Sequence, residues 1–117
     1  MKKVYFLKTC STCQRILKEI NTTNFELQEI KTNAITANQL EEMFLLAGSY
    51  EALFNKRAQL YKARNLKEQV ISEQDYKQLI LEEYTFLKRP VFMVDQEIFI
   101  GNSKKVIESL KEKLAKI

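Results

Sequence analysis

Two cysteines spaced three residues apart are the part of this sequence best suited to chemistry. The motif Cys10-Ser11-Thr12-Cys13 holds both cysteines of the chain and lies between an apolar run and a helical pattern. Free backbone N–H groups at a helix N-terminus, together with the helix dipole, stabilise negative charge there. A cysteine at that position has a lowered pKa, and its thiolate is a nucleophile. We therefore expect a reactive thiol here.

The two cysteines are expected to differ in role. Cys10 lies at the edge of the loop and is the better candidate for the nucleophile, the alternative being an incidental loop thiol. Cys13 lies one helical turn further in, near enough to attack a mixed disulfide or a sulfenate on Cys10. It also falls on the apolar helix face, where a free cysteine is commonly a small core residue. The N–H groups around Ser11 and Thr12 are candidates for holding an oxyanion against the sulfur.

The composition excludes several other chemistries. With no histidine in 117 residues, the chain has no Ser-His-Asp or Cys-His catalysis and no imidazole metal ligand. Two cysteines cannot complete a structural zinc site, so we expect no bound metal or other cofactor. The net charge of +4 is modest, and we expect no direct nucleic-acid contact. The densest basic cluster, which is interpreted as the solvated side of a helix, is Lys56, Arg57, Lys62, Arg64 and Lys67.

No segment predicts a membrane span or an export signal. The chain lacks a run of eighteen apolar residues. The first seven residues resemble the start of a signal peptide, but Lys8 interrupts the apolar run and no small-residue cleavage site follows. We therefore expect a cytoplasmic protein with no membrane partner.

Hydrophobic periodicity predicts the elements that position the cysteines. Residues 2–7 predict a buried strand, and residues 25–30 alternate like a half-buried one. Between them a helix is expected to run to about residue 21, with an apolar face made of Cys13, Ile16, Leu17 and Ile20. This order predicts a βαβ unit with parallel strands.

A helical stretch is expected next. Thr36 and Gln39 form a capping box for a helix that ends at Gly48. Residues 50–68 are expected to be helical in one or two pieces, and Ser72 with Asp75 caps a further helix.

The C-terminal part predicts a hairpin and a last helix. Pro90 opens a strand over residues 91–94, which Asp95-Gln96 joins to a strand over residues 97–100. Ser103 caps the helix that follows. We expect one α/β domain over residues 1–117, with a mixed sheet in the order β-α-β … β-β-α and a helical insertion over about 36–84. Arg89 would place a fixed cation beside the thiol, and a proline opening a strand there is either cis or trans.

Three sets of residues give the chain a resemblance to a known family. They are Val4-Tyr5 leading to Cys10-Ser11-Thr12-Cys13, Leu53-Phe54-Asn55-Lys56-Arg57 with Tyr61 and Leu66, and Leu87-Lys88-Arg89-Pro90-Val91 with Ile100-Gly101. In this order they make the whole chain similar to the glutaredoxin-linked arsenate reductases and the Spx-type regulators. The resemblance implies a thioredoxin-like fold with a helical insertion and a cis bond before Pro90.

The arsenate reductase side of the resemblance implies a thiol-dependent oxidoreductase. Cys10 matches the nucleophile that attacks the oxyanion, and Arg57 and Arg89 match the arginines that hold it. The implied substrate is a small oxyanion or a thiol or disulfide compound. The implied reductant is glutathione with glutaredoxin, or thioredoxin.

Departures from the reductase pattern favour the regulators instead. Cys13 is usual in Spx-type members and is usually missing from reductases that use external glutathione. The arginine that follows the last strand in arsenate reductases is replaced near Gly101, and the arginine after the cysteine loop is Gln14, with Arg15 one place on. The alternative is therefore a regulator that binds the alpha subunit of RNA polymerase and is switched by a Cys10–Cys13 disulfide.

Overall fold

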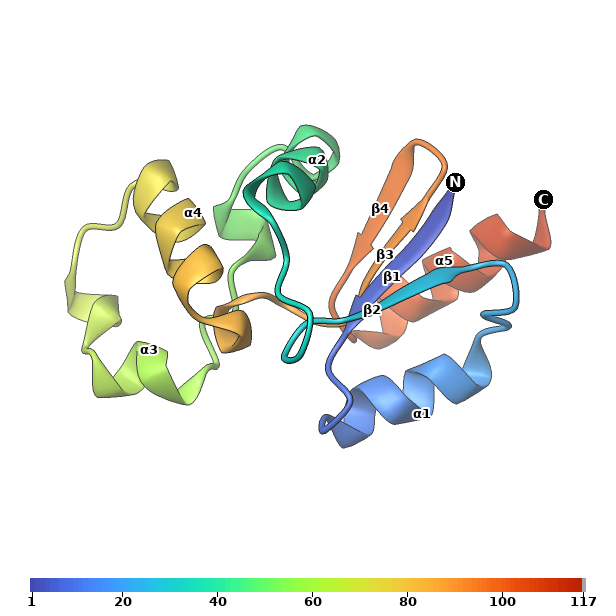
Figure 1. Cartoon of the computed structure of the whole chain (residues 1–117), viewed down its shortest axis with the longest axis horizontal. Coiled ribbons are helices and arrows are strands. Elements are labelled where there is room, and N and C mark those ends of the chain that lie inside the picture. The colour runs from blue at the N-terminus through green and yellow to red at the C-terminus, as the bar shows by residue number, and fades with distance from the viewer. Residues whose placement is uncertain (117) are drawn as a thin grey trace. The chain divides into compact units, whose positions relative to one another are not determined.

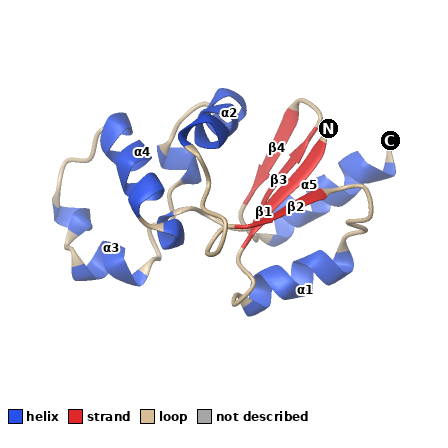
Figure 2. Cartoon of the chain, in the orientation of Figure 1, coloured by secondary structure: helices blue, strands red, loops and turns tan. Residues whose placement is uncertain are grey.

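The computed structural model describes residues 1–116, which form a four-stranded sheet and a series of helices (Figures 1 and 2). The strands are β1 (Lys2–Phe6), β2 (Glu26–Glu29), β3 (Val91–Val94) and β4 (Glu97–Ile100). The α-helices are α1 (Ser11–Glu19), α2 (Ala37–Ala47), α3 (Gln59–Ala63), α4 (Glu73–Glu82) and α5 (Lys104–Ala115). Short 3-10 helices are η1 (Glu51–Leu53), η2 (Leu66–Glu68) and η3 (Tyr84–Phe86).

The chain divides into two compact units. The sheet unit consists of Met1–Ala34 and Arg89–Ile117, and the helical unit of Ile35–Lys88. The sheet unit contains all four strands with α1 and α5, and the helical unit contains α2 to α4 with the 3-10 helices. Arg89 is thus the residue at which the chain re-enters the sheet unit.

The sheet is mixed, with the strand order β2-β1-β3-β4. β1 and β2 are parallel and are joined through α1, which confirms the predicted βαβ unit. β3 pairs antiparallel with both β1 and β4, and the β3–β4 pair confirms the predicted hairpin. Its turn includes Asp95 with a left-handed φ of 55°, a conformation that aspartate tolerates better than most residues.

One hydrophobic core holds α1 and α5 against the sheet. Its buried residues come from three strands, both helices and the loop before β2: Val4, Ile16, Ile20, Phe25, Phe92, Val94, Phe99, Ile107 and Leu110. The predicted cap of α5 is confirmed, since the backbone N–H of Val106 donates to Ser103 Oγ at 3.2 Å. This core fixes the direction of α1, whose first turn carries the cysteines.

The predicted boundaries of α2 and α4 are confirmed by their caps. Thr36 and Gln39 form a reciprocal capping box, and Gly48 ends α2 with a left-handed φ of 89°. Ser72 and Asp75 form the same reciprocal box at the start of α4. These local signals can be read from the sequence because each one is satisfied within four residues.

Residues 50–68 were predicted to be helical in one or two pieces, and this prediction was wrong in the number and the length of the pieces. That stretch is broken into η1, α3 and η2. Asn55 Oδ1 accepts a hydrogen bond from the backbone N–H of Arg57 at 3.0 Å, and Asn65 adopts a left-handed φ of 53°. Asparagine side chains compete with helical hydrogen bonds in this way, and asparagine enters the left-handed region more easily than most residues. Both breaks follow from the chemistry of asparagine.

Within residues 1–116, no helix combines the length and the apolar character that crossing a membrane requires. The cytoplasmic location stays a prediction.

We predict that Phe92→Ala destabilises the sheet unit by about 3–5 kcal/mol, the range for large-to-small changes at buried aromatic positions. Phe92 is fully buried, and its ring meets that of Phe25 edge-on with centroids 5.7 Å apart. Urea unfolding followed by circular dichroism measures the change. As a control, Leu27→Ala on β2, where the side chain is 52% exposed, should stay within about 0.5 kcal/mol. Equal losses in both variants would contradict the assigned core.

Candidate active site

A tight turn delivers Cys10 from the end of β1 to the start of α1. The backbone N–H of Cys10 donates to the carbonyl oxygen of Leu7 at 3.1 Å, which closes the turn. Cys10 is the N-cap residue of α1, with extended backbone angles, and its carbonyl oxygen accepts the first helical hydrogen bond, from Gln14, at 3.0 Å. Unlike Thr36, Ser72 and Ser103, it supplies no side-chain oxygen to cap its helix. Cys10 therefore brings a sulfur atom, and not a capping oxygen, to the start of α1, and its side chain makes no capping hydrogen bond there.

The surroundings of the Cys10 thiol favour its ionised form. Partial burial alone would raise the pKa of Cys10, but other contributions outweigh it. In order of size, they are a backbone hydrogen bond from Cys13, a side-chain hydrogen bond from Cys13, the charge of Arg89, and a backbone hydrogen bond from Thr12. Together they hold the pKa of Cys10 below its ordinary value. A half-buried thiol in this state has the properties of a nucleophile.

Cys13 lies beside Cys10, but its surroundings favour the neutral thiol. Its side chain is completely buried, and this burial is the main reason that its pKa rises to about 12. A backbone hydrogen bond from Leu7 and the charge of Arg89 act in the other direction. The neighbouring Cys10 raises the pKa of Cys13 further, first through the charge of its sulfur and then through a hydrogen bond with the Cys13 thiol. Both cysteines are free, so the structure holds the dithiol form.

The strand register brings Arg89 and Pro90 to the end of β1. Tyr5 of β1 lies opposite Val91, the first residue of β3, so Pro90 lies beside the residues that lead into the Cys10 turn. The Arg89–Pro90 peptide bond is cis, as the resemblance implied. Pro90 is buried, and its carbonyl oxygen accepts a hydrogen bond from the backbone N–H of Gly101 at 2.9 Å. Arg89 is half-buried and close enough to Cys10 to lower the pKa of its thiol.

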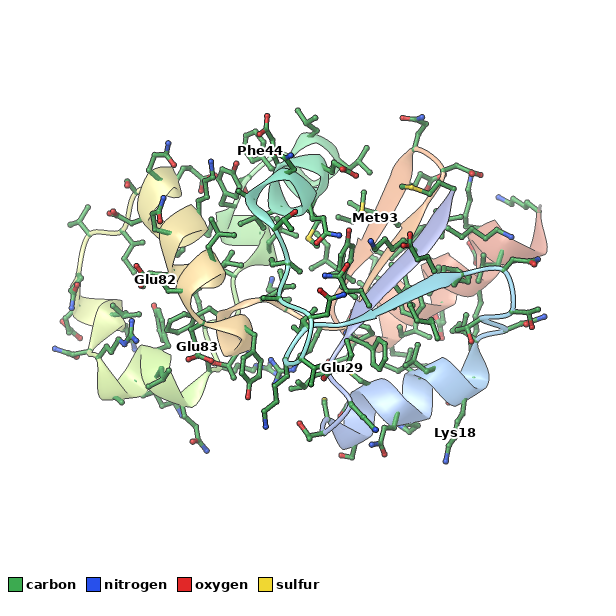
Figure 3. The ribbon with its side chains drawn as sticks, viewed as in Figure 1. Lys18, Glu29, Phe44, Glu82, Glu83 and Met93 are labelled. Carbon is green, nitrogen blue, oxygen red and sulfur yellow. The ribbon has the colours of Figure 1, made fainter. Side chains whose placement is uncertain are left out.

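Sequence reasoning missed the contacts on the other side of the turn. Glu29, which is labelled in Figure 3, lies at the end of β2. Its side chain accepts a hydrogen bond from the backbone N–H of Lys8 at 2.9 Å. The side-chain amide of Gln14 donates to the carbonyl oxygen of Lys8. One usable signal existed: the predicted parallel pairing of residues 2–7 with residues 25–30 puts the end of the second strand beside the loop that follows the first.

The other predicted site residues lie in two places. Ser11 and Thr12 form the first turn of α1, Ser11 exposed and Thr12 half-buried. Arg57 is exposed and belongs to the helical unit, where the side chain of Asn55 fixes its backbone. Contact of Arg57 with an oxyanion stays a prediction. Among residues 1–116, no group of three or more His, Cys, Asp or Glu side chains is arranged to hold a metal ion.

Comparison with known proteins places these features in context. The sequence matches the ArsC family over residues 5–110. No curated protein matches it in sequence. Among solved structures, the arsenate reductase from Vibrio cholerae is similar, with a TM-score of 0.73, 18% identity, and coverage of 95% of each chain.

Two further structures have similar folds. A Yersinia pestis protein has a TM-score of 0.78 and 16% identity, with 96% of this chain and 99% of that chain covered. SACOL0876 from Staphylococcus aureus has a TM-score of 0.75 and 24% identity, with 93% and 97% covered. At these identities the similarity establishes the fold, which is the expected thioredoxin-like α/β fold.

We predict that alkylation at neutral pH modifies Cys10 and leaves Cys13 unmodified, and that Arg89→Gln moves the pH profile of Cys10 alkylation to higher pH. The reason is that Arg89 lowers the pKa of Cys10, so its removal weakens the thiolate. Iodoacetamide labelling across a pH series, with mass spectrometry of each cysteine, measures both effects.

Arg15→Gln is the matched control, because it removes the same charge from an exposed α1 side chain paired with Glu19. The assignment of Arg89 fails if the two variants shift the profile equally, or if neither does.

Proposed function

Because the chain belongs to the ArsC family, we propose that it is a thiol-dependent oxidoreductase in which Cys10 is the nucleophile. The observation that carries this proposal is the environment of the Cys10 sulfur. Backbone N–H groups, the thiol of Cys13 and the charge of Arg89 all favour the thiolate. A half-buried sulfur whose thiolate form is favoured is available to a substrate as a nucleophile.

With a disulfide substrate, the two cysteines act in succession. The Cys10 thiolate attacks one sulfur, forms a mixed disulfide and releases the first thiolate of the substrate. Cys13 then loses its proton and attacks the Cys10 sulfur, which releases the second thiolate and leaves a Cys10–Cys13 disulfide. The substrate gains two electrons, and the cysteine pair loses them.

The proton of Cys13 is easier to release after Cys10 has reacted than before. While Cys10 is a thiolate, its charge and its hydrogen bond hold the proton on Cys13. Once Cys10 is in a mixed disulfide, that charge is gone, and the pKa of Cys13 falls to a balance between burial, which raises it, and the Leu7 backbone and Arg89, which lower it. Cys13 therefore stays inactive until there is an intermediate for it to attack.

A small oxyanion such as arsenate is the other substrate class. The Cys10 thiolate attacks arsenic, and one arsenate oxygen takes up protons from solvent and leaves as water, so that Cys10 is bonded to As(V). A second thiolate, from Cys13 or glutathione, then attacks the Cys10 sulfur. The electron pair of the S–As bond stays on arsenic, which leaves as As(III), and the two sulfurs form a disulfide. The N–H groups at Ser11, Thr12 and Cys13 suit an anion at the start of a helix. Arg89 and Arg57 are the proposed cationic partners, since arginine pairs with oxyanions through two parallel hydrogen bonds.

The oxidised protein then needs an external reductant. We propose glutathione with glutaredoxin, or thioredoxin, as the partner that returns two electrons to the cysteines. No bound cofactor enters this cycle, because each electron passes through a sulfur atom. The fully buried Cys13 makes the Cys10 sulfur the point that a reductant must attack.

We predict that Cys10→Ser abolishes reduction of both arsenate and disulfide substrates, because a serine hydroxyl is not ionised at neutral pH. Coupled assays with glutathione and glutaredoxin, and with thioredoxin, measure turnover. Cys13→Ser is the informative partner variant: it should block the internal disulfide and leave a glutathione adduct on Cys10, visible by mass spectrometry. Full turnover by Cys10→Ser would refute the proposal.

The adjacent cysteines also favour a second candidate, a redox-switched regulator. The thiols of Cys10 and Cys13 are neighbours that shift each other's pKa, as expected of two cysteines that can be oxidised to one disulfide. In this role the disulfide is the signal, and the partner is the alpha subunit of RNA polymerase.

We predict for this candidate that a pulldown with the C-terminal domain of the alpha subunit retains the protein in one redox state only. The reduced protein, the oxidised protein and Cys13→Ser form the comparison set, and Cys13→Ser should behave as the reduced protein under oxidation. Absence of binding in both states eliminates the regulator and leaves the enzyme.

A further inference from the structure

Glu29 is tied to two loops at once by one carboxylate. Its Oε2 accepts a hydrogen bond from the backbone N–H of Lys8 at 2.9 Å. Its Oε1 accepts bonds from the backbone N–H groups of Lys31 at 3.0 Å and Thr32 at 2.8 Å, and from the Thr32 hydroxyl at 2.9 Å. Partial burial opposes ionisation, but these donors hold the pKa of Glu29 below its usual range. The side chain is therefore a carboxylate at neutral pH, with four directed donors.

The sheet explains why Glu29 reaches the Cys10 turn. In the parallel register, Phe6 of β1 lies beside Glu29 of β2, and the backbone N–H of Ile30 donates to the carbonyl oxygen of Phe6 at 2.9 Å. The carboxylate therefore extends from the last residue of β2 to the loop that leaves β1.

The peptide group between Leu7 and Lys8 transmits this contact to Cys10. Its N–H, from Lys8, donates to Glu29, and its carbonyl oxygen, from Leu7, accepts the N–H of Cys10 at 3.1 Å. A peptide that donates to a charged acceptor is held more firmly than one that donates to a neutral one. On the next peptide, the carbonyl oxygen of Lys8 is held by the side chain of Gln14 in α1. The turn is thus fixed to β2 on one side and to α1 on the other.

We propose that Glu29 is a positioning residue for the nucleophile: its carboxylate holds the Leu7–Cys10 turn so that the Cys10 sulfur stays over the N–H groups of Thr12 and Cys13. This role rests on the proposed function, in which the Cys10 thiolate reacts. Glu29 touches no reacting atom and acts through the Leu7–Lys8 peptide. A negative charge near a thiolate disfavours it, so any help that Glu29 gives Cys10 comes from its geometry and not from its charge.

Geometry and charge have opposite effects on Cys10, so substitutions can separate them. Glu29→Gln removes the charge and keeps an oxygen acceptor at the same reach. Glu29→Asp keeps the charge, but its side chain is one methylene shorter and cannot span both loops. Glu29→Ala removes both. Positioning predicts that Asp and Ala raise the midpoint of the Cys10 alkylation profile, whereas Gln leaves it close to that of the unaltered protein.

The experiment is iodoacetamide labelling of Cys10 across a pH series in the full chain, with mass spectrometry. We expect Glu29→Ala and Glu29→Asp to alkylate about tenfold more slowly at neutral pH, the scale of one hydrogen bond to a charged group. Glu26→Gln is the matched control, because it removes an exposed β2 carboxylate whose only recorded contact in residues 1–116 is an ion pair with Lys3 at 3.7 Å.

Two results would overturn the proposal. A lower midpoint in both Glu29→Gln and Glu29→Ala would mean that Glu29 acts through its charge, and unchanged profiles in Glu29→Ala and Glu29→Asp would mean that it does not position Cys10. Urea unfolding of each variant shows whether the fold is kept. If Glu29→Ala does not fold, the comparison of Glu29→Asp with Glu29→Gln tests the positioning role.

The labelling needs no substrate, which keeps this inference separate from the proposed function. If the unaltered protein reduces neither arsenate nor disulfides, the function is wrong, but the Glu29 profiles still test the positioning role. Where turnover is measurable, Glu29→Asp should lower kcat/KM in proportion to its loss of thiolate, and raising the assay pH should restore it.

Discussion

The candidate site depends on one interaction. Backbone N–H groups at the start of α1 stabilise negative charge on the sulfur of Cys10. A helix offers these donors only at its first turn, so the sulfur must lie at the N-cap and nowhere else. β1 brings the chain to that point, the Leu7–Cys10 turn sets the angle, and the core under α1 fixes the direction of the helix. Each of these elements is ordinary, and together they place Cys10 at the start of α1.

The Leu7–Cys10 turn has a cationic residue, Arg89, on one side and an anionic residue, Glu29, on the other, and the two act in different ways. Arg89 comes from the segment before β3 and acts on the sulfur through its charge. Glu29 comes from the end of β2 and acts on the backbone through directed hydrogen bonds. An acid placed where Arg89 is would oppose the thiolate, and a cation placed where Glu29 is would offer the Lys8 N–H no acceptor. The mixed sheet makes this arrangement possible, because both neighbours of β1 meet its carboxyl end.

Much of this arrangement could be predicted from the sequence, and each failure has its own physical cause. The cysteine motif, the helix caps and the hairpin depend on residues within a few positions of one another, so the pattern is visible in the chain. The cis bond before Pro90 required the family resemblance, because local sequence leaves both isomers open. Glu29 was missed because its partner lies twenty-one positions away. The breaks in residues 50–68 were missed because the apolar residues there have helical spacing, while Asn55 and Asn65 interrupt the helix through their own backbone and side-chain conformations.

The unusual N-cap of α1 has a consequence for folding stability. A neutral thiol is a poor cap, and substituting a good N-cap residue with a non-capping one typically costs about 0.5–2 kcal/mol. The thiolate is a better acceptor, so ionising Cys10 also completes the helix. The pKa of Cys10 is lower in the folded protein than in the unfolded chain, so ionisation of Cys10 stabilises the folded state. This stabilisation is fully present above the pKa of the unfolded chain. It is lost as the pH falls through the pKa of the folded protein. In the proposed reaction, α1 would lose this acceptor each time the Cys10 sulfur forms a covalent bond and would regain it with the thiolate.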